Sequence, residues 1–230
     1  MLKQLIKELE SLADSKQADM LQRFFKTGRG EYGEGDVFLG IKVPIQRAVA
    51  RKYEGLKLED IQKLLDSKIH DHRMIGLFIL INLYQKNRNK EIVDFYLANT
   101  KRVNNWDLVD LSCHQILGNW LLSKDRKVLY NLAKSENLWE KRIAIISTYA
   151  FIREKDFKDT LKISEILLND KHDLIHKAVG WMLREVGKKD VGVLEVFLKK
   201  HYKKMPRTML RYSIEKFPEE LRQKYLKGLI

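Results

Sequence analysis

The sequence is poor in residues that break helices or form cross-links. Its 230 residues include only three prolines, twelve glycines and one cysteine, Cys113. A single cysteine excludes an internal disulfide framework and fits a reducing compartment such as the cytosol. With few breakers, long segments run uninterrupted, which favours helices, and the alternation of apolar and polar residues typical of strands is hard to find.

Long apolar runs are absent as well. No run approaches the roughly 18 to 20 apolar residues of a membrane span, and the first residues lack the apolar core of a signal peptide. We therefore expect a cytoplasmic protein that makes no membrane contact. The length is sufficient for one domain with a sizeable core, spanning residues 1–230.

Charge of one sign dominates. Lys and Arg exceed Asp and Glu by 44 − 31 = 13 residues, which favours a polyanionic partner, nucleic acid more often than an acidic membrane. A generally basic proteome would give the same excess, so charge alone does not decide the partner.

Apolar residues recur at helical spacing along most of the chain. The pattern predicts helices over residues 2–25 with a break at Asp14-Ser15, then 44–53, 58–65, 72–84, 91–98, 107–122, 128–133, 139–152, 160–167, 174–186, 192–200 and 207–216. Between the first two lies a glycine-rich segment, residues 27–40, with a G-x-G-x-x-G match. The dinucleotide motif requires a preceding strand, and here a helix precedes. We expect a flexible loop there, with Arg29 near phosphate.

Internal repetition organises these helices. Arg73, Asp107, Arg142, Lys177 and Arg211 recur at intervals of 34, 35, 35 and 34 residues. Each opens or lies within an apolar helix that follows a shorter amphipathic one. This pattern predicts an all-α fold, a right-handed α-solenoid of HEAT-like helical pairs with a concave face. If the second helices line that face, they form a basic trough suited to a phosphate backbone; the alternative is a set of solvated helix ends.

One stretch, residues 101–110, stands out chemically. Asn104 or Asn105 can cap the helix that follows, and Trp106 and Asp110 are one turn apart on one face. Because apolar neighbours make burial of the Asp110 carboxylate costly, it has either a structural partner or a cavity that receives a cation.

Several segments then carry a family likeness. They are Phe38-Leu39-Gly40-Ile41 followed by Pro44, Asn104-Asn105-Trp106-Asp107-Leu108-Val109-Asp110, Trp139-Glu140-Lys141-Arg142, Lys177-Ala178-Val179-Gly180-Trp181-Met182-Leu183-Arg184-Glu185, and Pro206-Arg207-Thr208-Met209-Leu210-Arg211-Tyr212. The chain resembles the DNA alkylation repair family of HEAT-like alkylpurine DNA glycosylases, the AlkD-like proteins. The resemblance implies excision of cationic N3- or N7-alkylated purines, such as 3-methyladenine and 7-methylguanine, from double-stranded DNA in base excision repair.

The resemblance also implies roles for residues. The catalytic carboxylate falls on Asp110, two aromatic walls on Trp106 and Trp181, an arginine near the lesion on Arg142, and an aromatic against the DNA backbone on Phe24. Arg184, Lys177 and Arg211 complete the expected DNA contacts. We expect a monomer at the nucleoid that uses no metal and no cofactor.

The residues permit such chemistry. A purine alkylated at N3 or N7 already carries positive charge and leaves as a neutral base, so no general acid is needed. One carboxylate can stabilise the oxocarbenium-like sugar and place a water. Indole rings attract the cationic nucleotide by about 0.5–2 kcal/mol each, and Arg142 can grip a phosphate with a forked contact.

Structural interpretations compete at each position. Trp120, Trp139 and Cys113 are expected in the core, and Asp107 is expected as a cap. Arg142 and Arg184 could pair with acidic neighbours. His172 and His176 have a metal-compatible spacing without the rest of a motif, and His70-Asp71-His72 is expected on the surface.

Two other functions remain open at this point. One is a non-enzymatic solenoid that binds damaged or branched DNA or RNA, and the other is a scaffold for protein partners.

Overall fold

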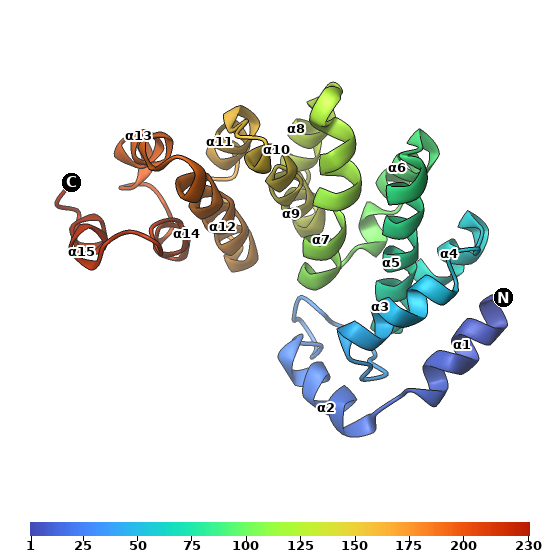
Figure 1. The fold of residues 1–230 in the computed structure, drawn as a ribbon. Coiled ribbons are helices and arrows are strands. Elements are labelled where there is room, and N and C mark those ends of the chain that lie inside the picture. The colour runs from blue at the N-terminus through green and yellow to red at the C-terminus, as the bar shows by residue number, and fades with distance from the viewer. The chain divides into compact units, whose positions relative to one another are not determined.

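The computed structural model describes residues 1–230, and it is entirely helical apart from one isolated bridge between Val37 and Ile69 (Figure 1). The α-helices are α1 (Leu2–Ser11), α2 (Ser15–Phe24), α3 (Val43–Lys52), α4 (Leu58–Leu65), α5 (His70–Asn87), α6 (Lys90–Ala98), α7 (Trp106–Ser112), α8 (Lys127–Ala133), α9 (Leu138–Ser147), α10 (Tyr149–Arg153), α11 (Lys158–Ile166), α12 (Asp173–Lys189), α13 (Val191–His201), α14 (Arg207–Ser213) and α15 (Glu219–Lys227). None of them is long and apolar enough to cross a membrane.

The five repeat positions all fall on second helices, which confirms the helical-pair repeat. Arg73, Asp107, Arg142, Lys177 and Arg211 lie on α5, α7, α9, α12 and α14, and each of these helices is preceded by the first helix of its pair. The expectation that the first helix is the shorter one is wrong for two pairs, because α6 and α13 have 9 and 11 residues whereas α7 and α14 have 7 each. The predicted break at Asp14-Ser15 is also confirmed, because the Asp14 carboxylate caps α2 by accepting from the Gln17 N–H. α15 was missed, since its short sequence is mostly charged.

The chain divides into two compact units within α7: residues Met1–Leu108 and residues Val109–Ile230. The expectation of a single domain stays a prediction. In the first unit α5 is the central element, packed by α3, α4 and α6. It is buried along most of its length, from His70 to Ile81, as expected of a helix that is apolar on nearly all sides.

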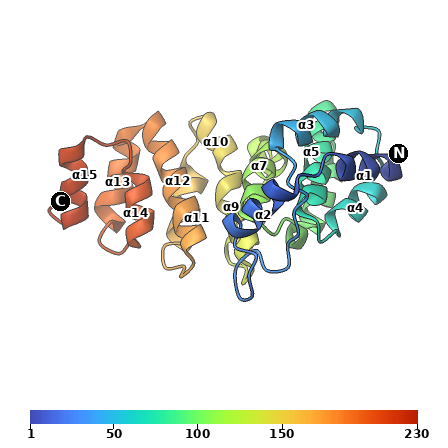
Figure 2. The same ribbon diagram turned by 90° about the horizontal axis from the view of Figure 1, so that it is seen from below.

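In the second unit the helices form two layers (Figures 1 and 2). α9, α12 and α14 pack side by side in one layer, and α8 and α11 pack together in the other, which α13 extends. Gly180 allows α12 to approach α14 closely: a Cβ there would lie 2.5 Å from the Tyr212 Cβ and 2.6 Å from the Met209 carbonyl oxygen.

The helix that begins at α7 does not continue as a regular α-helix. A π-helical turn occupies His114–Gly118 and a 3-10 turn occupies Leu121–Ser123. The predicted range of 107–122 is therefore helical, but it changes pitch in the middle. Such π-turns are rare and are frequently found at functional sites, so this one draws attention to the residues on either side of it.

Candidate functional site

In the second unit, the carboxylate of Asp110 forms an ion pair with the guanidinium of Arg142. The guanidinium of Arg142 donates from Nε to Oδ1 at 2.8 Å and from Nη2 to Oδ2 at 2.7 Å. This two-point contact is the strongest geometry for such a pair. The Asp110 side chain is still 18% exposed, whereas that of Arg142 is 6% exposed. Asp110 thus has the structural partner that the sequence left open, and its carboxylate also remains partly accessible.

The same guanidinium reaches a third helix. Its Nη1 donates to the carbonyl oxygen of Leu174, in the first turn of α12, at 2.5 Å. The Nε and Nη2 atoms of Arg142, which could together bind a phosphate, therefore donate to Asp110 instead. Arg142 instead joins α7, α9 and α12, and its contacts fix the orientation of the carboxylate.

The first turn of α12 is held in place by its own contacts. The carboxylate of Asp170 receives Lys141 Nζ at 2.5 Å and the backbone N–H of His172 at 2.8 Å. Burial alone would raise the pKa of Asp170, yet these two partners lower it. The His172 ring accepts from the Leu174 N–H, and the His176 ring contacts the Asp170 carbonyl at 2.6 Å. Both histidines therefore have partners within the fold.

An aromatic row accompanies the ion pair. The rings of Trp181 and Tyr149 have centroids 6.2 Å apart, and His114 meets the Tyr149 ring edge-on at 5.4 Å. All three are half-buried. Burial and the nearby charge of Arg153 lower the pKa of His114 to about 4, so its ring is neutral at neutral pH. The row is a partly exposed aromatic surface without charge.

Sequence spacing relates two of these rings to the ion pair. His114 follows Asp110 by four residues, and Trp181 follows Leu174, whose carbonyl oxygen accepts from Arg142, by seven residues along α12. Both spacings return to the same helical face. Tyr149 begins α10, beyond the end of α9 at Ser147. The sequence analysis identified Trp181 and missed Tyr149 and His114.

The remaining basic candidates of the second unit differ in their surroundings. Arg184 pairs with Glu215, and Lys177 pairs with Asp173 at 2.7 Å. Arg211 is exposed and forms no ion pair. The pairing of Arg142 and Arg184 with acidic neighbours, considered as an alternative from the sequence, is what the structure shows.

In the first unit, Phe24 and Trp106 lie together. Phe24 is 61% exposed, and its ring meets that of Trp106 edge-on, with centroids 6.0 Å apart. Trp106 in turn stacks on the buried Phe25, with centroids 5.2 Å apart and planes 17° from parallel. The Asn105 side chain accepts from the Trp106 N–H at 2.8 Å, which confirms the predicted cap.

A buried charge network lies beneath these rings. His70 contacts Asp36 through Nδ1 at 3.2 Å and Asp107 through Nε2 at 2.9 Å. Arg73 donates to the other Asp36 oxygen at 2.7 Å, and the Asn105 amide donates to Asp36 at 3.2 Å. Burial favours a neutral imidazole, but the two carboxylates outweigh it and raise the pKa of His70 to about 8. The ring is therefore an imidazolium held between two carboxylates.

This network corrects two expectations. His70, Asp71 and His72 were expected on the surface, and all three are buried. The reason is the second half of the glycine-rich segment, which covers them: Leu39 and Ile41 donate their backbone N–H groups to the Asp71 carboxylate at 2.8 and 3.1 Å. That half of the segment is anchored by hydrogen bonds instead of being a free loop.

The predicted basic trough also needs correction. Arg73 and Arg142, two of its four cationic repeat positions, are buried and paired with carboxylates. They add no exposed positive charge. Of the expected core residues, Trp139 and Cys113 are buried, whereas Trp120 is only half-buried beneath Lys124. Asp107 accepts from the Leu108 N–H as well as pairing with His70.

Comparisons with known proteins place the chain in a family. The model of the DNA alkylation repair enzyme family matches residues 5–217. No curated protein sequence matches the chain. Among solved structures, a predicted DNA alkylation repair enzyme from Enterococcus faecalis is similar, with a TM-score of 0.71 at 17% identity over 90% of this chain and 97% of that one. AlkD2 from Streptococcus mutans has a TM-score of 0.56 at 17% identity, over 89% and 98% of the two chains.

The match to the family model spans nearly the whole chain, and the similar structures share its fold. Membership supports a role in the repair of alkylated DNA. On this evidence the chain belongs to the DNA alkylation repair enzyme family.

Proposed function

We propose that this protein is a monofunctional DNA glycosylase that hydrolyses the N-glycosidic bond of cationic N3- and N7-alkylated purines. The observation that carries the proposal is the Asp110 carboxylate, which is fixed by Arg142 yet 18% exposed. An oriented, accessible anion is what a developing sugar cation requires. The family match supports alkylated DNA as the substrate.

In this proposal Asp110 stabilises the positive charge that forms at the sugar as the neutral base leaves. It also accepts a hydrogen bond from the water that attacks C1′. As the water oxygen bonds to C1′, the glycosidic bond breaks with its electron pair leaving on the base, and the proton of the water passes through this carboxylate to solvent. A carboxylate has about four lone-pair positions on its two oxygens, so the two bonds from Arg142 leave capacity for a water.

The positive charge of Arg142 reduces the attraction between the Asp110 carboxylate and the sugar cation but does not cancel it. At an effective dielectric constant of about 20, a unit cation about 4 Å from the carboxylate gains about 4 kcal/mol. A guanidinium about 4 Å farther from that cation than the carboxylate repels the cation by about 2 kcal/mol. The difference of about 2 kcal/mol corresponds to roughly a 30-fold rate increase, and Arg142 contributes by holding the carboxylate in a fixed orientation.

The aromatic groups are proposed to contact the lesion. Trp181, backed by Tyr149, presents a neutral ring surface to a cationic base, an attraction of about 0.5–2 kcal/mol. Trp106 and Phe24 offer a second ring surface on the first unit. Arg211 is the most available phosphate contact because no carboxylate competes for it; Lys177 and Arg184 can contribute only by leaving Asp173 and Glu215.

One observation favours a second candidate function. Both oxygens of Asp110 already accept hydrogen bonds from Arg142, as expected of a purely structural ion pair. Under this alternative the protein binds damaged or branched DNA without breaking a bond. Its affinity would fall steeply with salt, and no base would be released.

A base-release assay separates the two functions. The protein is incubated with duplex DNA methylated by dimethyl sulfate, and free 7-methylguanine and 3-methyladenine are quantified by mass spectrometry. The proposal expects release that is first order in enzyme–DNA complex and absent from unmethylated DNA. Salt-dependent binding with release no faster than the spontaneous rate would contradict it and support the alternative.

A further inference from the structure

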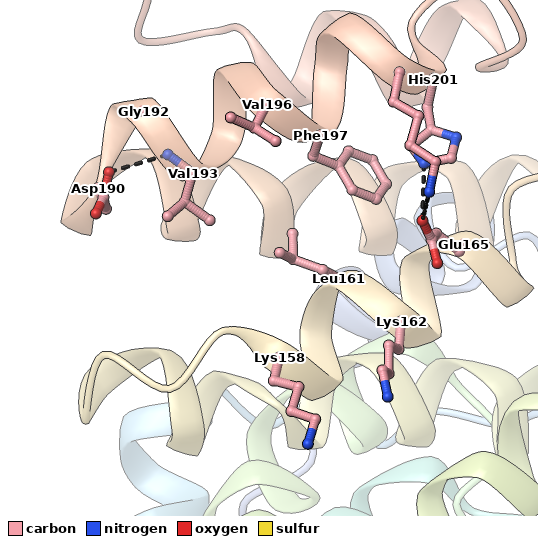
Figure 3. Close-up of a pocket in the computed structure, with 11 residues that line it drawn as sticks. Lys158, Leu161, Lys162, Glu165, Asp190, Gly192, Val193, Val196, Phe197 and His201 are labelled. Carbon is pink, nitrogen blue, oxygen red and sulfur yellow. Dashed lines mark hydrogen bonds and ion pairs between the residues drawn. The ribbon is translucent and has the colours of Figure 1, made fainter.

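A groove crosses the second unit between α11 and α13, in the layer formed by α8, α11 and α13 (Figure 3). Its volume is about 660 Å³. Leu161 faces it from α11, and Val193, Val196 and Phe197 face it from α13 (Figure 3). Val196 is 71% exposed. Its side chain, beside the other apolar groups of the groove, is available for contact with a partner.

The charges around the groove are not balanced. Glu165, at one end, forms ion pairs with Lys200 and His201, each at 2.9 Å (Figure 3). Asp190, at the other end, caps α13 by accepting from the Val193 N–H at 3.0 Å. Both acidic groups of the rim therefore have partners within the fold.

The two lysines on the other rim of the groove, Lys158 and Lys162, have no ion-pair partner. Lys158 and Lys162 are one turn apart along α11, both are exposed, and neither forms an ion pair. The groove thus combines an apolar floor with a row of positive charge along one side. It is complementary to a ligand that has apolar groups on one face and carboxylates beside them.

We propose that this groove docks an acidic amphipathic helix of another protein. α11 and α13 have 9 and 11 residues, and at about 1.5 Å per residue they offer a track of roughly 13–16 Å, or about three helical turns. A helix of that length can lay apolar residues at i, i+3, i+4 and i+7 into the groove and place Glu or Asp beside Lys158 and Lys162.

The alternatives fit less well. A second copy docked through the same face would bring the lysine rows of the two molecules together, because a two-fold interface pairs a surface with itself. Nucleic acid would find a floor without hydrogen-bond donors, and aliphatic side chains do not stack with bases as exposed aromatic ones do. The inference does not depend on the proposed glycosylase activity.

The test uses the full chain and a synthetic probe. A fluorescein-labelled peptide of about 14 residues, with Leu at i, i+3, i+4 and i+7 and Glu at the flanking positions, is titrated by fluorescence anisotropy. The control peptide has Lys in place of Glu. We expect the acidic peptide to bind and the basic one not to bind. We also expect the double variant Lys158→Glu/Lys162→Glu, and separately Val196→Asp, to weaken binding by about tenfold or more.

The chain offers a matched control. Lys3 and Lys7 are also one turn apart on a helix, α1, and line a smaller groove with Ile6 as its one apolar side chain. The double variant Lys3→Glu/Lys7→Glu makes the same charge change and should leave the affinity within about twofold. An equal loss in this control, equal binding of the basic peptide, or no binding of the acidic peptide would overturn the proposal. Self-association lost in Val196→Asp would overturn it in favour of a second copy.

Base release from methylated DNA separates this inference from the proposed function. Neither lysine belongs to the proposed reaction site, so the Lys158→Glu/Lys162→Glu variant should release bases at the wild-type rate. A loss of release in parallel with a loss of peptide binding would contradict an independent docking groove.

Discussion

The imidazolium of His70 makes a prediction about pH and stability. Its pKa is raised to about 8 by Asp107 and Asp36, against the opposing effect of burial. The ordinary value is 6.5. The difference, 8 − 6.5, is about 1.5 units, and at 1.36 kcal/mol per unit the protonated ring contributes about 2 kcal/mol to the folded state.

The sign follows from the raised pKa. The contribution is fully present below pH 6.5, where the ring is protonated in both folded and unfolded chains. It is lost as the pH rises from 6.5 through about 8, because the unfolded chain then releases the proton more easily than the folded one. The free energy of unfolding should therefore fall by about 2 kcal/mol from this source between pH 6 and pH 9.

The perturbation is Asp107→Asn. It removes the charge beside Nε2, and the Asn side-chain oxygen can still accept from the Leu108 N–H. We expect the pKa of His70 to fall and the pH-dependent part of the stability to shrink. The pKa of His72 and His114 is lowered by burial, so these residues contribute in the opposite direction. Subtracting the variant's pH profile from that of the wild type cancels them.

Two measurements check this reasoning. NMR titration of the ring ¹³Cε1–¹H signal, assigned by its loss in His70→Gln, should give a midpoint near 8 in the wild type and a lower one in Asp107→Asn. Urea unfolding at pH 6 and pH 9 should show the smaller difference in the variant. A wild-type midpoint at or below 6.5, or identical pH profiles of stability, would refute the stabilisation of the His70 imidazolium by Asp107 and Asp36.

Three further predictions follow from the packing. Gly180→Ala should lower the free energy of unfolding by about 1–3 kcal/mol, measured by urea titration, because the new methyl group would overlap Tyr212; an unchanged midpoint would contradict the close approach of α12 to α14. Cys113 is fully buried and its pKa is raised by burial, so the native protein should not react with Ellman's reagent until it is unfolded. Phe24→Ala should change stability by less than about 1 kcal/mol, since the ring is mostly exposed, while the affinity for duplex DNA in a filter-binding assay falls; unchanged affinity would remove Phe24 from the DNA contacts.

The sequence predicted the helices and their pairing well because both depend on local periodicity. The interval of 34–35 residues located five second helices. Asp14 and Asn105 marked helix starts because their side chains accept from backbone N–H groups of the first turn, and Pro44 did so as a proline in the first turn of α3. α15 escaped because a mostly charged helix has no clear apolar stripe.

The partners of charged residues could not be predicted in the same way. The Asp36–Arg73 contact joins residues 37 apart, and the Asp110–Arg142 contact joins residues 32 apart. Periodicity places such residues on helices without saying which carboxylate lies opposite. The trough hypothesis failed at Arg73 and Arg142 for this reason: a cation at a regular position can face a buried acid as easily as solvent. The π-turn at His114–Gly118 likewise leaves no mark in the hydrophobic pattern.

The rate at which Asp110→Asn releases 7-methylguanine in single turnover tests the central claim most directly. Because this substitution also weakens a buried ion pair, Asp159→Asn is the matched control: Asp159 pairs with Arg126 at 2.6 Å and Tyr130 at 2.5 Å in the same unit. We expect release to fall by about 30-fold or more in Asp110→Asn, with DNA binding retained, and to stay near the wild-type rate in Asp159→Asn once both are assayed well below their unfolding temperatures. Equal rates in Asp110→Asn and the wild type would mean that this carboxylate only holds Arg142 in place.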